Sequence, residues 1–196
     1  MTKHRLDTRT GLGLDQPISE RWQGFSMQEL NEGNLHLLAA GASDMEAVAK
    51  ALRKAGAPAI PEVGKSVDGN GNARLMWCGN QQWFLHVGDA EIGRQMAGNL
   101  SSLTNLTDQS DGWVVMRIEG DKTRKVLEKL CPIDLDPGVF PAGACARAPF
   151  EGLATLIACE DAEAGRYLLL FQRSSSRSFV EHLRHAANSS CGGKDH

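Results

Sequence analysis

Two histidines near the end of the chain are the first residues whose spacing could serve chemistry. His182 and His185 stand three positions apart in a stretch with a helical apolar period, so their side chains would lie close together. Such a pair can supply two ligands to a zinc ion, but a closed zinc site needs four. No cysteine or carboxylate cluster completes the set. We therefore interpret both histidines as solvated residues on a helix surface and predict no metal site.

A second candidate is the Asp/Asn/Gly-rich stretch Asp68–Asn72, which resembles the start of a calcium-binding loop. That loop needs glycine at its sixth position and an acidic residue at its twelfth. Here those positions hold Ala73 and Gly79. The stretch is therefore predicted to be a hairpin turn.

The remaining polar residues stand at positions where a turn or a helix cap explains their presence without a functional site. Gly11-Leu-Gly13 is too short for a dinucleotide fingerprint, and no strand precedes it. A run of three serines ending at Ser176 could meet an anion at a helix N-terminus, although a capping role explains it as well. Several aspartates stand beside turn residues, where their side chains bond locally: Asp108, Asp111, Asp134 and Asp136.

No nucleophile paired with a histidine, no phosphate loop and no Gly-x-Ser-x-Gly motif occurs in the sequence. We accordingly predict no catalytic, no cofactor-binding and no metal-binding residue, which favours a non-catalytic role. An enzyme with an unrecognised site is the alternative, and it would require perturbed titratable groups in a cleft.

Composition narrows the class of protein. The chain has 196 residues, of which 41% are apolar, and a net charge of −3 from 21 basic and 24 acidic residues. This balance argues against nucleic acid or an anionic membrane surface as a partner. No apolar run approaches the ~20 residues of a membrane span. Five scattered cysteines and the lack of an apolar leader predict a soluble, cytoplasmic protein with reduced thiols.

Two stretches of the chain match in their order of elements. Each reads as a strand, a glycine, an acidic residue, a helix, two paired strands and a second helix, over residues 35–103 and 113–187. This pattern predicts an α+β fold made of two ferredoxin-like β-α-β-β-α halves, each with helices on one face of a mixed sheet. The exposed sheet faces should be buried against each other, or the sheets should join edge to edge.

The rest of the chain surrounds this duplication. Residues 1–24 are predicted to form an extended N-terminal arm, either disordered or laid on a partner with Trp22 as an anchor. Residues 25–187 form the single two-repeat domain, and residues 188–196 form a flexible tail. Polar turn residues after Leu30 predict a hairpin between the strand that starts at Phe25 and the strand near Leu35.

The segment Asp108–Arg147 resembles the gamma subunit of heterotetrameric sarcosine oxidase, most specifically in Cys131-Pro-Ile-Asp134-Leu and Phe140-Pro-Ala-Gly143. The resemblance extends over roughly Phe25 to Ala187. That subunit is in turn similar to the folate-binding lobe of glycine-cleavage aminomethyltransferases, in which two ferredoxin-like halves pack together.

The resemblance implies a complex of four different chains that oxidatively demethylates sarcosine. Its products are glycine, hydrogen peroxide and formaldehyde, the last captured as methylenetetrahydrofolate. In that family the large alpha and beta chains hold NAD, FAD, FMN and the tetrahydrofolate site, and the small delta chain holds zinc. The resemblance therefore implies a gamma subunit without a cofactor of its own, with the alpha, beta and delta subunits as partners and alpha the most direct one.

One departure from the aminomethyltransferase pattern concerns folate chemistry. Those enzymes place acidic residues after the glycine that starts a central strand, whereas Ala154 and Thr155 follow Gly152 here. The group expected to assist the folate amine is therefore missing. The alternative function is a stand-alone folate-binding protein of the iron–sulfur maturation type, which shares the fold. That family carries a Lys-Gly-Cys-Tyr motif, which this sequence lacks.

Overall fold

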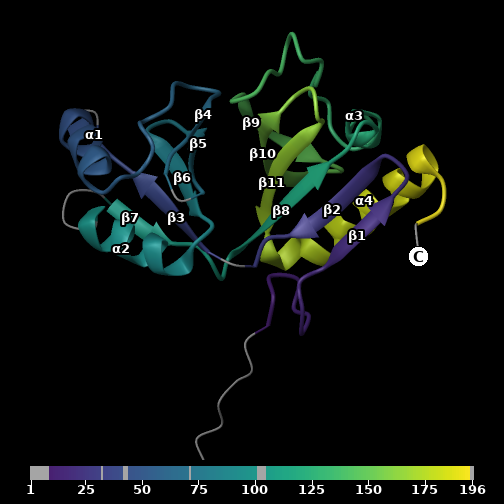
Figure 1. Cartoon of the computed structure of the whole chain (residues 1–196), viewed down its shortest axis with the longest axis horizontal. Coiled ribbons are helices and arrows are strands. Elements are labelled where there is room, and N and C mark those ends of the chain that lie inside the picture. Colours follow the sequence, from purple (N-terminus) through teal and green to yellow (C-terminus); the bar gives the residue numbers. More distant parts are fainter. Residues whose placement is uncertain (1–8, 32, 42–43, 71, 101–104, 195–196) are drawn as a thin grey trace, which may run out of the picture.

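Two antiparallel β-sheets face each other in the computed structural model of the chain, and helices cover the outer face of each (Figure 1). The structure describes residues 9–31, 33–41, 44–70, 72–100 and 105–194. The predicted α+β class with two ferredoxin-like halves is confirmed. The predicted mixed sheets are wrong, because every pair of neighbouring strands in both sheets runs antiparallel.

The first half forms a five-stranded sheet in the order β4-β5-β6-β3-β7. Its elements are β3 (Asn34–Ala39), α1 (Met45–Lys54), β4 (Ser66–Asp68), β5 (Ala73–Gly79), β6 (Gln82–Val87), α2 (Ala90–Leu100) and β7 (Asn105–Asp108). The predicted turn at Asp68 is confirmed as the β4–β5 hairpin, in which Asp68 pairs with Arg74. Asp89 caps α2 by accepting hydrogen bonds from two backbone N–H groups of its first turn, at 2.8 and 2.9 Å.

The second half forms a six-stranded sheet in the order β1-β2-β8-β11-β10-β9. Its elements are β1 (Ser19–Trp22), β2 (Phe25–Glu29), β8 (Trp113–Glu119), α3 (Thr123–Leu127), β9 (Cys145–Phe150), β10 (Leu153–Asp161), β11 (Arg166–Gln172), a 3₁₀ turn (Arg173–Ser175) and α4 (Ser176–Cys191). The long Pro/Gly segment between α3 and β9 rises as a loop at one end of this half (Figure 1).

The two sheets correspond strand by strand, with one exception in chain order. The order β4-β5-β6-β3 in the first half matches β9-β10-β11-β8 in the second. The fifth place is taken by β7 in the first half, which follows α2, but by β2 in the second, which comes from the N-terminal end of the chain. The second half is therefore completed by a strand that precedes the first half in sequence.

This arrangement makes the predicted hairpin wrong. β2 pairs with β1 and β8, while β3 pairs with β6 and β7 in the other sheet. The backbone N–H of Leu30 still bonds to the carbonyl of Val115, at 2.9 Å, before the chain crosses between the sheets. The polar residues after Leu30 therefore belong to a crossing segment and not to a tight turn.

The structure also differs from the predicted boundaries at both ends of the chain. Part of the predicted arm is the edge strand β1, and Trp22 is 2% exposed within this chain's own core. The Glu29 carboxylate accepts hydrogen bonds from the backbone N–H groups of Leu12 (3.1 Å) and Ile18 (3.4 Å), which attaches residues 12–18 to the sheet. At the other end α4 continues to Cys191, inside the predicted tail.

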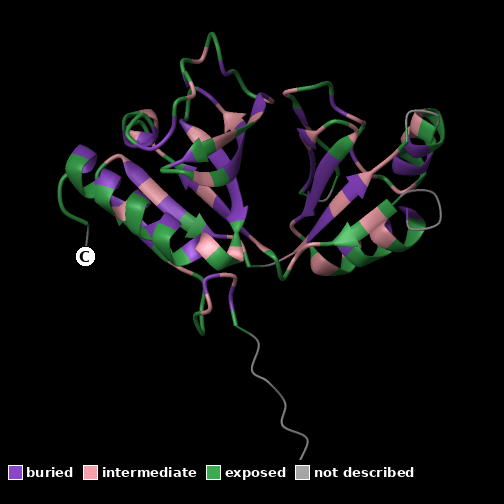
Figure 2. Ribbon diagram, turned by 180° about the vertical axis from the view of Figure 1, so that it is seen from behind, coloured by how far each residue is buried: buried purple, intermediate pink, exposed green. Residues whose placement is uncertain are grey.

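Three apolar layers follow from the alternation of side chains along the strands. The outer face of each sheet packs on its own helices, around Leu52 and Leu85 in the first half and around Tyr167 and Leu183 in the second. The inner faces meet in a shared layer, which confirms that the halves bury their sheets against each other (Figure 2). Its buried members are Leu35, Met76, Cys78, Phe84, Val115, Cys145, Leu156, Ala158, Leu168 and Leu170.

The sheets also touch at one edge, where Lys65 and Ala144 form an antiparallel bridge beside β4 and β9. Within the described part of the chain, no helix has the length and apolar character to cross a membrane.

Candidate functional site

A cluster of charged side chains interrupts the apolar layer between the sheets. Arg74 on β5 and His86 on β6 come from the first half, and Arg117 on β8 and Glu160 on β10 come from the second. Each stands two positions from an apolar residue of the shared layer, and alternation along a strand therefore turns it to the same inner face.

Glu160 is the centre of this cluster. Its side chain is 9% exposed, and its two carboxylate oxygens accept hydrogen bonds from the Nε and Nη2 atoms of Arg117, at 2.7 and 2.9 Å. The nearest nitrogens of Arg166 and Arg74 lie 3.7 and 4.0 Å away. The bond to Glu160 raises the pKa of Arg117 above its usual range. A buried carboxylate with three arginine neighbours is well compensated.

Arg74 ties the halves together. Its guanidinium contacts the Asp68 carboxylate at 2.7 Å within the first half, and Nη1 donates to the backbone carbonyl of Cys159 in the second half at 3.3 Å. The Arg74 side chain is 9% exposed, whereas its partner Asp68 is 69% exposed, so only the bond to Cys159 forms largely away from water. The cluster therefore joins the two sheets through polar contacts, as Arg147 also does by donating to the Cys78 carbonyl at 3.2 Å.

His86 lies beside Arg74 on the neighbouring strand and is 7% exposed. Burial lowers the pKa of His86 to about 4, helped by the positive charge of Arg117 and against the opposite effect of Glu160. The imidazole is thus neutral at pH 7, with one N–H donor and one nitrogen acceptor. Among the described residues, no hydrogen bond to its ring is found.

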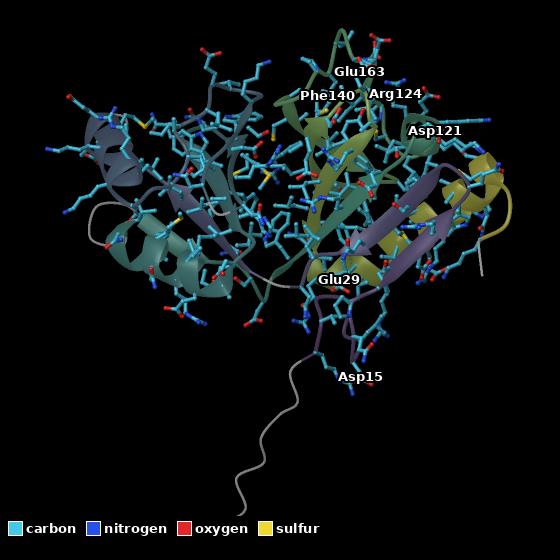
Figure 3. All side chains as sticks on the ribbon, in the orientation of Figure 1. Asp15, Glu29, Asp121, Arg124, Phe140 and Glu163 are labelled. Atoms are coloured by element: carbon cyan, nitrogen blue, oxygen red, sulfur yellow. The ribbon has the colours of Figure 1, made fainter. Side chains whose placement is uncertain are left out.

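A cavity of about 200 Å³ opens next to His86, where the two segments that connect the sheets run close together. Leu30, Asn31 and Gly33 belong to the first connection, and Ser110 and Asp111 to the second. Its wall also includes Asn34, Leu35, Trp113, Val114, Val115 and Arg173, together with residues of the N-terminal segment. Figure 3 places Glu29, another residue of this wall, at the C-terminal end of β2 near the crossing.

All five cysteines are free and buried. Burial raises the pKa of Cys78 and Cys159 to about 11 and that of Cys145 to about 12, so each thiol stays protonated at neutral pH. Nucleophilic attack and metal binding both require the thiolate. Within the described residues, no group of three or more His, Cys, Asp or Glu could hold a metal ion.

The residues singled out in the sequence do not come together. His182 and His185 are exposed on α4, as predicted. Three of the aspartates bond locally in turns, also as predicted: Asp108 accepts from Ser110, Asp134 from the Asp136 backbone, and Asp136 from Gly138. Asp111 makes no such turn bond and lines the cavity.

Ala154 and Thr155, which follow Gly152, belong to β10. Ala154 is exposed, and the Thr155 side chain is buried with its hydroxyl donating to the Leu153 carbonyl at 3.1 Å. Neither side chain carries a charge that could assist an amine.

The sequence reasoning missed the cluster between the sheets. Its signal was present as single polar residues at inner-face positions of apolar strands, such as Arg74 in RLMWC and Arg117 in VVMRIE. A single charge in such a strand can equally face solvent, so only the pairing of the two halves distinguishes the cases.

No protein-family model and no curated protein matches the sequence. The arrangement of two ferredoxin-like halves with facing sheets is found in a solved structure described as heterotetrameric sarcosine oxidase from Corynebacterium sp. U-96 in complex with pyrrole 2-carboxylate. One of its chains superposes with a TM-score of 0.75 at 20% identity, covering 90% of each chain. At this identity the likeness establishes the fold.

A second solved structure, a putative C-terminal regulatory domain of aspartate kinase from Porphyromonas gingivalis W83, gives a TM-score of 0.41 at 7% identity. It covers 86% of this chain and 98% of its own, but the score is too low to support a relationship.

Proposed function

We propose that this chain is a non-catalytic, gamma-type subunit of a heterotetrameric sarcosine oxidase, in which it stabilises the assembly. The fold carries this proposal, because the likeness to a chain of such an enzyme spans 90% of both chains at a TM-score of 0.75. The motif around Cys131–Gly143 supports it independently, since that resemblance rests on residue types and not on shape.

The chemistry of the inner layer fits a structural role. Glu160, Arg117 and Arg74 satisfy one another, and the buried thiols are protonated, so these side chains are suited to holding the halves together. In the proposed complex the alpha and beta chains carry NAD, FAD, FMN and tetrahydrofolate, and the delta chain carries zinc. The complex would work in the cytoplasm, where buried free thiols persist.

This chain would act by covering an apolar face of its alpha partner. A stable contact of this kind buries on the order of 1,600 Å² in total. Without that cover the exposed face would favour aggregation of the larger chains.

The test is co-expression of the alpha, beta and delta chains with and without this chain. We expect its omission to reduce the yield of soluble flavin-containing complex and to lower its thermal midpoint, and we expect the purified chain to restore both when it is added back. A tagged copy should co-purify with a yellow assembly. Equal yield and stability without this chain would contradict a stabilising role.

Calorimetry of the isolated chain with tetrahydrofolate distinguishes the proposed subunit from the alternative, a stand-alone folate-binding protein. Micromolar binding would favour a stand-alone folate-binding protein. We expect no saturable binding, because Ala154 and Thr155 stand where the aminomethyltransferases carry acidic residues.

A further inference from the structure

The cavity beside His86 is partly open to solvent and is lined by polar groups that the fold does not use. At about 200 Å³ it has room for several water molecules or for one molecule of amino-acid size. It lies at the seam of the two halves, and ligand sites form preferentially at such junctions.

Several polar side chains of its wall lack a hydrogen-bond or ion-pair partner within the described part of the chain, and one of them is the buried Oδ1 of Asn34. His86 is more than nine-tenths buried and makes no hydrogen bond there. Arg173 and Asp111 form no ion pair with each other or with any other described residue. By contrast, the Glu29 carboxylate and the Arg9 guanidinium, which also line the cavity, already bind backbone groups.

The backbone brings the two unpaired charges to the same wall. The N–H of Arg173 donates to the carbonyl of Gly112 at 2.9 Å, which fixes the end of β11 against the residue that follows Asp111. Trp113, next in the chain, is held by edge-on packing against Phe84, with ring centroids 4.9 Å apart. The backbones of Arg173 and Asp111 are thus held on adjacent segments, with the half-buried Arg173 and the exposed Asp111 both lining the cavity.

From this juxtaposition we infer that the cavity binds a small zwitterion, namely an amino acid. Arg173 binds its carboxylate and Asp111 its ammonium group, while the neutral His86 contributes a hydrogen bond from the buried side. Trp113 forms the apolar part of the wall. This inference does not depend on the proposed assembly, because every residue in it belongs to this chain.

The test is a titration of the full-length ¹⁵N-labelled chain with glycine, the smallest amino-acid zwitterion, followed by NMR. The Trp113 indole N–H, assigned with a Trp113→Phe variant, and the amides of residues 110–115 report binding. We expect saturable shifts with glycine. Acetate and methylammonium, which each carry one of its two charges, should bind at least about tenfold more weakly, a loss of about 1.4 kcal/mol.

Arg173→Gln and Asp111→Asn should each weaken glycine binding by at least about tenfold, again about 1.4 kcal/mol. The matched controls Arg53→Gln and Glu163→Gln remove exposed charges away from the cavity and should leave binding unchanged. Equal binding of acetate and glycine, unchanged binding in both cavity variants, or the absence of saturable shifts would each overturn the inference.

Discussion

Glu160 shows how one residue can join two halves of a chain. It accepts two hydrogen bonds from Arg117 with only 9% of its side chain exposed, and Arg74 of the other half lies 4.0 Å away. Because three cations surround a single carboxylate, its charge stabilises contacts on both sides of the interface.

Glu160→Gln should therefore destabilise the protein by about 2 kcal/mol, because Arg117 would lose the charged acceptor of its two hydrogen bonds. Chemical denaturation of the purified variant measures this loss. Glu163→Gln, an exposed neighbour in sequence, is the control and should change the free energy of unfolding by less than about 0.5 kcal/mol. If Glu160→Gln lowers the free energy of unfolding no more than the control does, Glu160 does not stabilise the contact between the two sheets.

The burial of His86 should make the free energy of unfolding depend on pH. Its pKa falls from 6.5 to about 4 on folding, so the folded state favours the neutral ring. The stability it contributes is complete above pH 6.5 and is lost as the pH falls toward 4, by up to roughly 3 kcal/mol. Buried carboxylates contribute to acid unfolding as well, so the contribution of His86 must be isolated by comparison.

Replacing His86 with glutamine removes the titrating group. The free energy of unfolding of His86→Gln should therefore decline less than that of the wild type between pH 6.5 and pH 4.5. Parallel denaturation curves across this range measure the difference. Identical pH profiles would show that His86 does not resist protonation in the folded state.

At the residue scale, the sequence allowed correct predictions for side chains that bond to residues close to them in the sequence. Asp108, Asp134 and Asp136 bond within turns, and Asp68 lies in a hairpin, because these roles depend on a few adjacent residues. The inner cluster was not predictable in the same way. Glu160 and Arg74 meet only because two distant strands face each other.

At the element scale, periodic stretches predicted three strands and two helices in each half, but not the edge strands β4, β7 and β9, and they did not predict every partner. β2 has turn residues after it and a strand beyond them, which is the local signature of a hairpin. Its actual neighbours are β1 and β8. The turn residues after β2 do not indicate that this strand pairs with the sheet of the second half, because that pairing depends on residues far away in the sequence.

The attachment of the β1–β2 hairpin depends on close backbone contact at Gly120. This residue has φ of +132°, and an added Cβ would lie 2.3 Å from the carbonyl oxygen of Gly24, in the turn between β1 and β2. A side chain there would force the hairpin away from β8.

Gly120→Ala should cost at least about 2 kcal/mol, from backbone strain plus the displaced hairpin. Gly152→Ala is the matched control, because Gly152 also has positive φ, at +80°, but no atom within 4 Å of an added Cβ. It should cost only about 1 kcal/mol. Thermal unfolding measures both, and equal losses would show that contact with Gly24 is unimportant.

At the scale of the whole molecule, the shared inner layer makes the two halves one structural unit. Met76 is fully buried in it and belongs to the first half, yet it packs in a cluster that includes Leu156 and Leu170 of the second. Without the other sheet, the apolar inner face of each sheet would be exposed to solvent.

Met76→Ala should accordingly destabilise both halves together, by about 2–5 kcal/mol. Hydrogen exchange at amides of β6 and β11 reports on the two halves separately. We expect protection to fall by the same free energy in both strands, with a single unfolding transition. A loss confined to β6, or two separate transitions, would show that the halves fold independently.

The position of β2 in the six-stranded sheet also has a consequence for synthesis on the ribosome. The N-terminal hairpin is made first, but its neighbour β8 emerges only after the entire first half. Until then the hairpin has an unpaired backbone edge and no core to cover its apolar side, and it cannot be stable alone. The first strands of the nascent chain must therefore stay unpaired with β8 until the second half has been synthesised, and we expect this long-range pairing to slow folding.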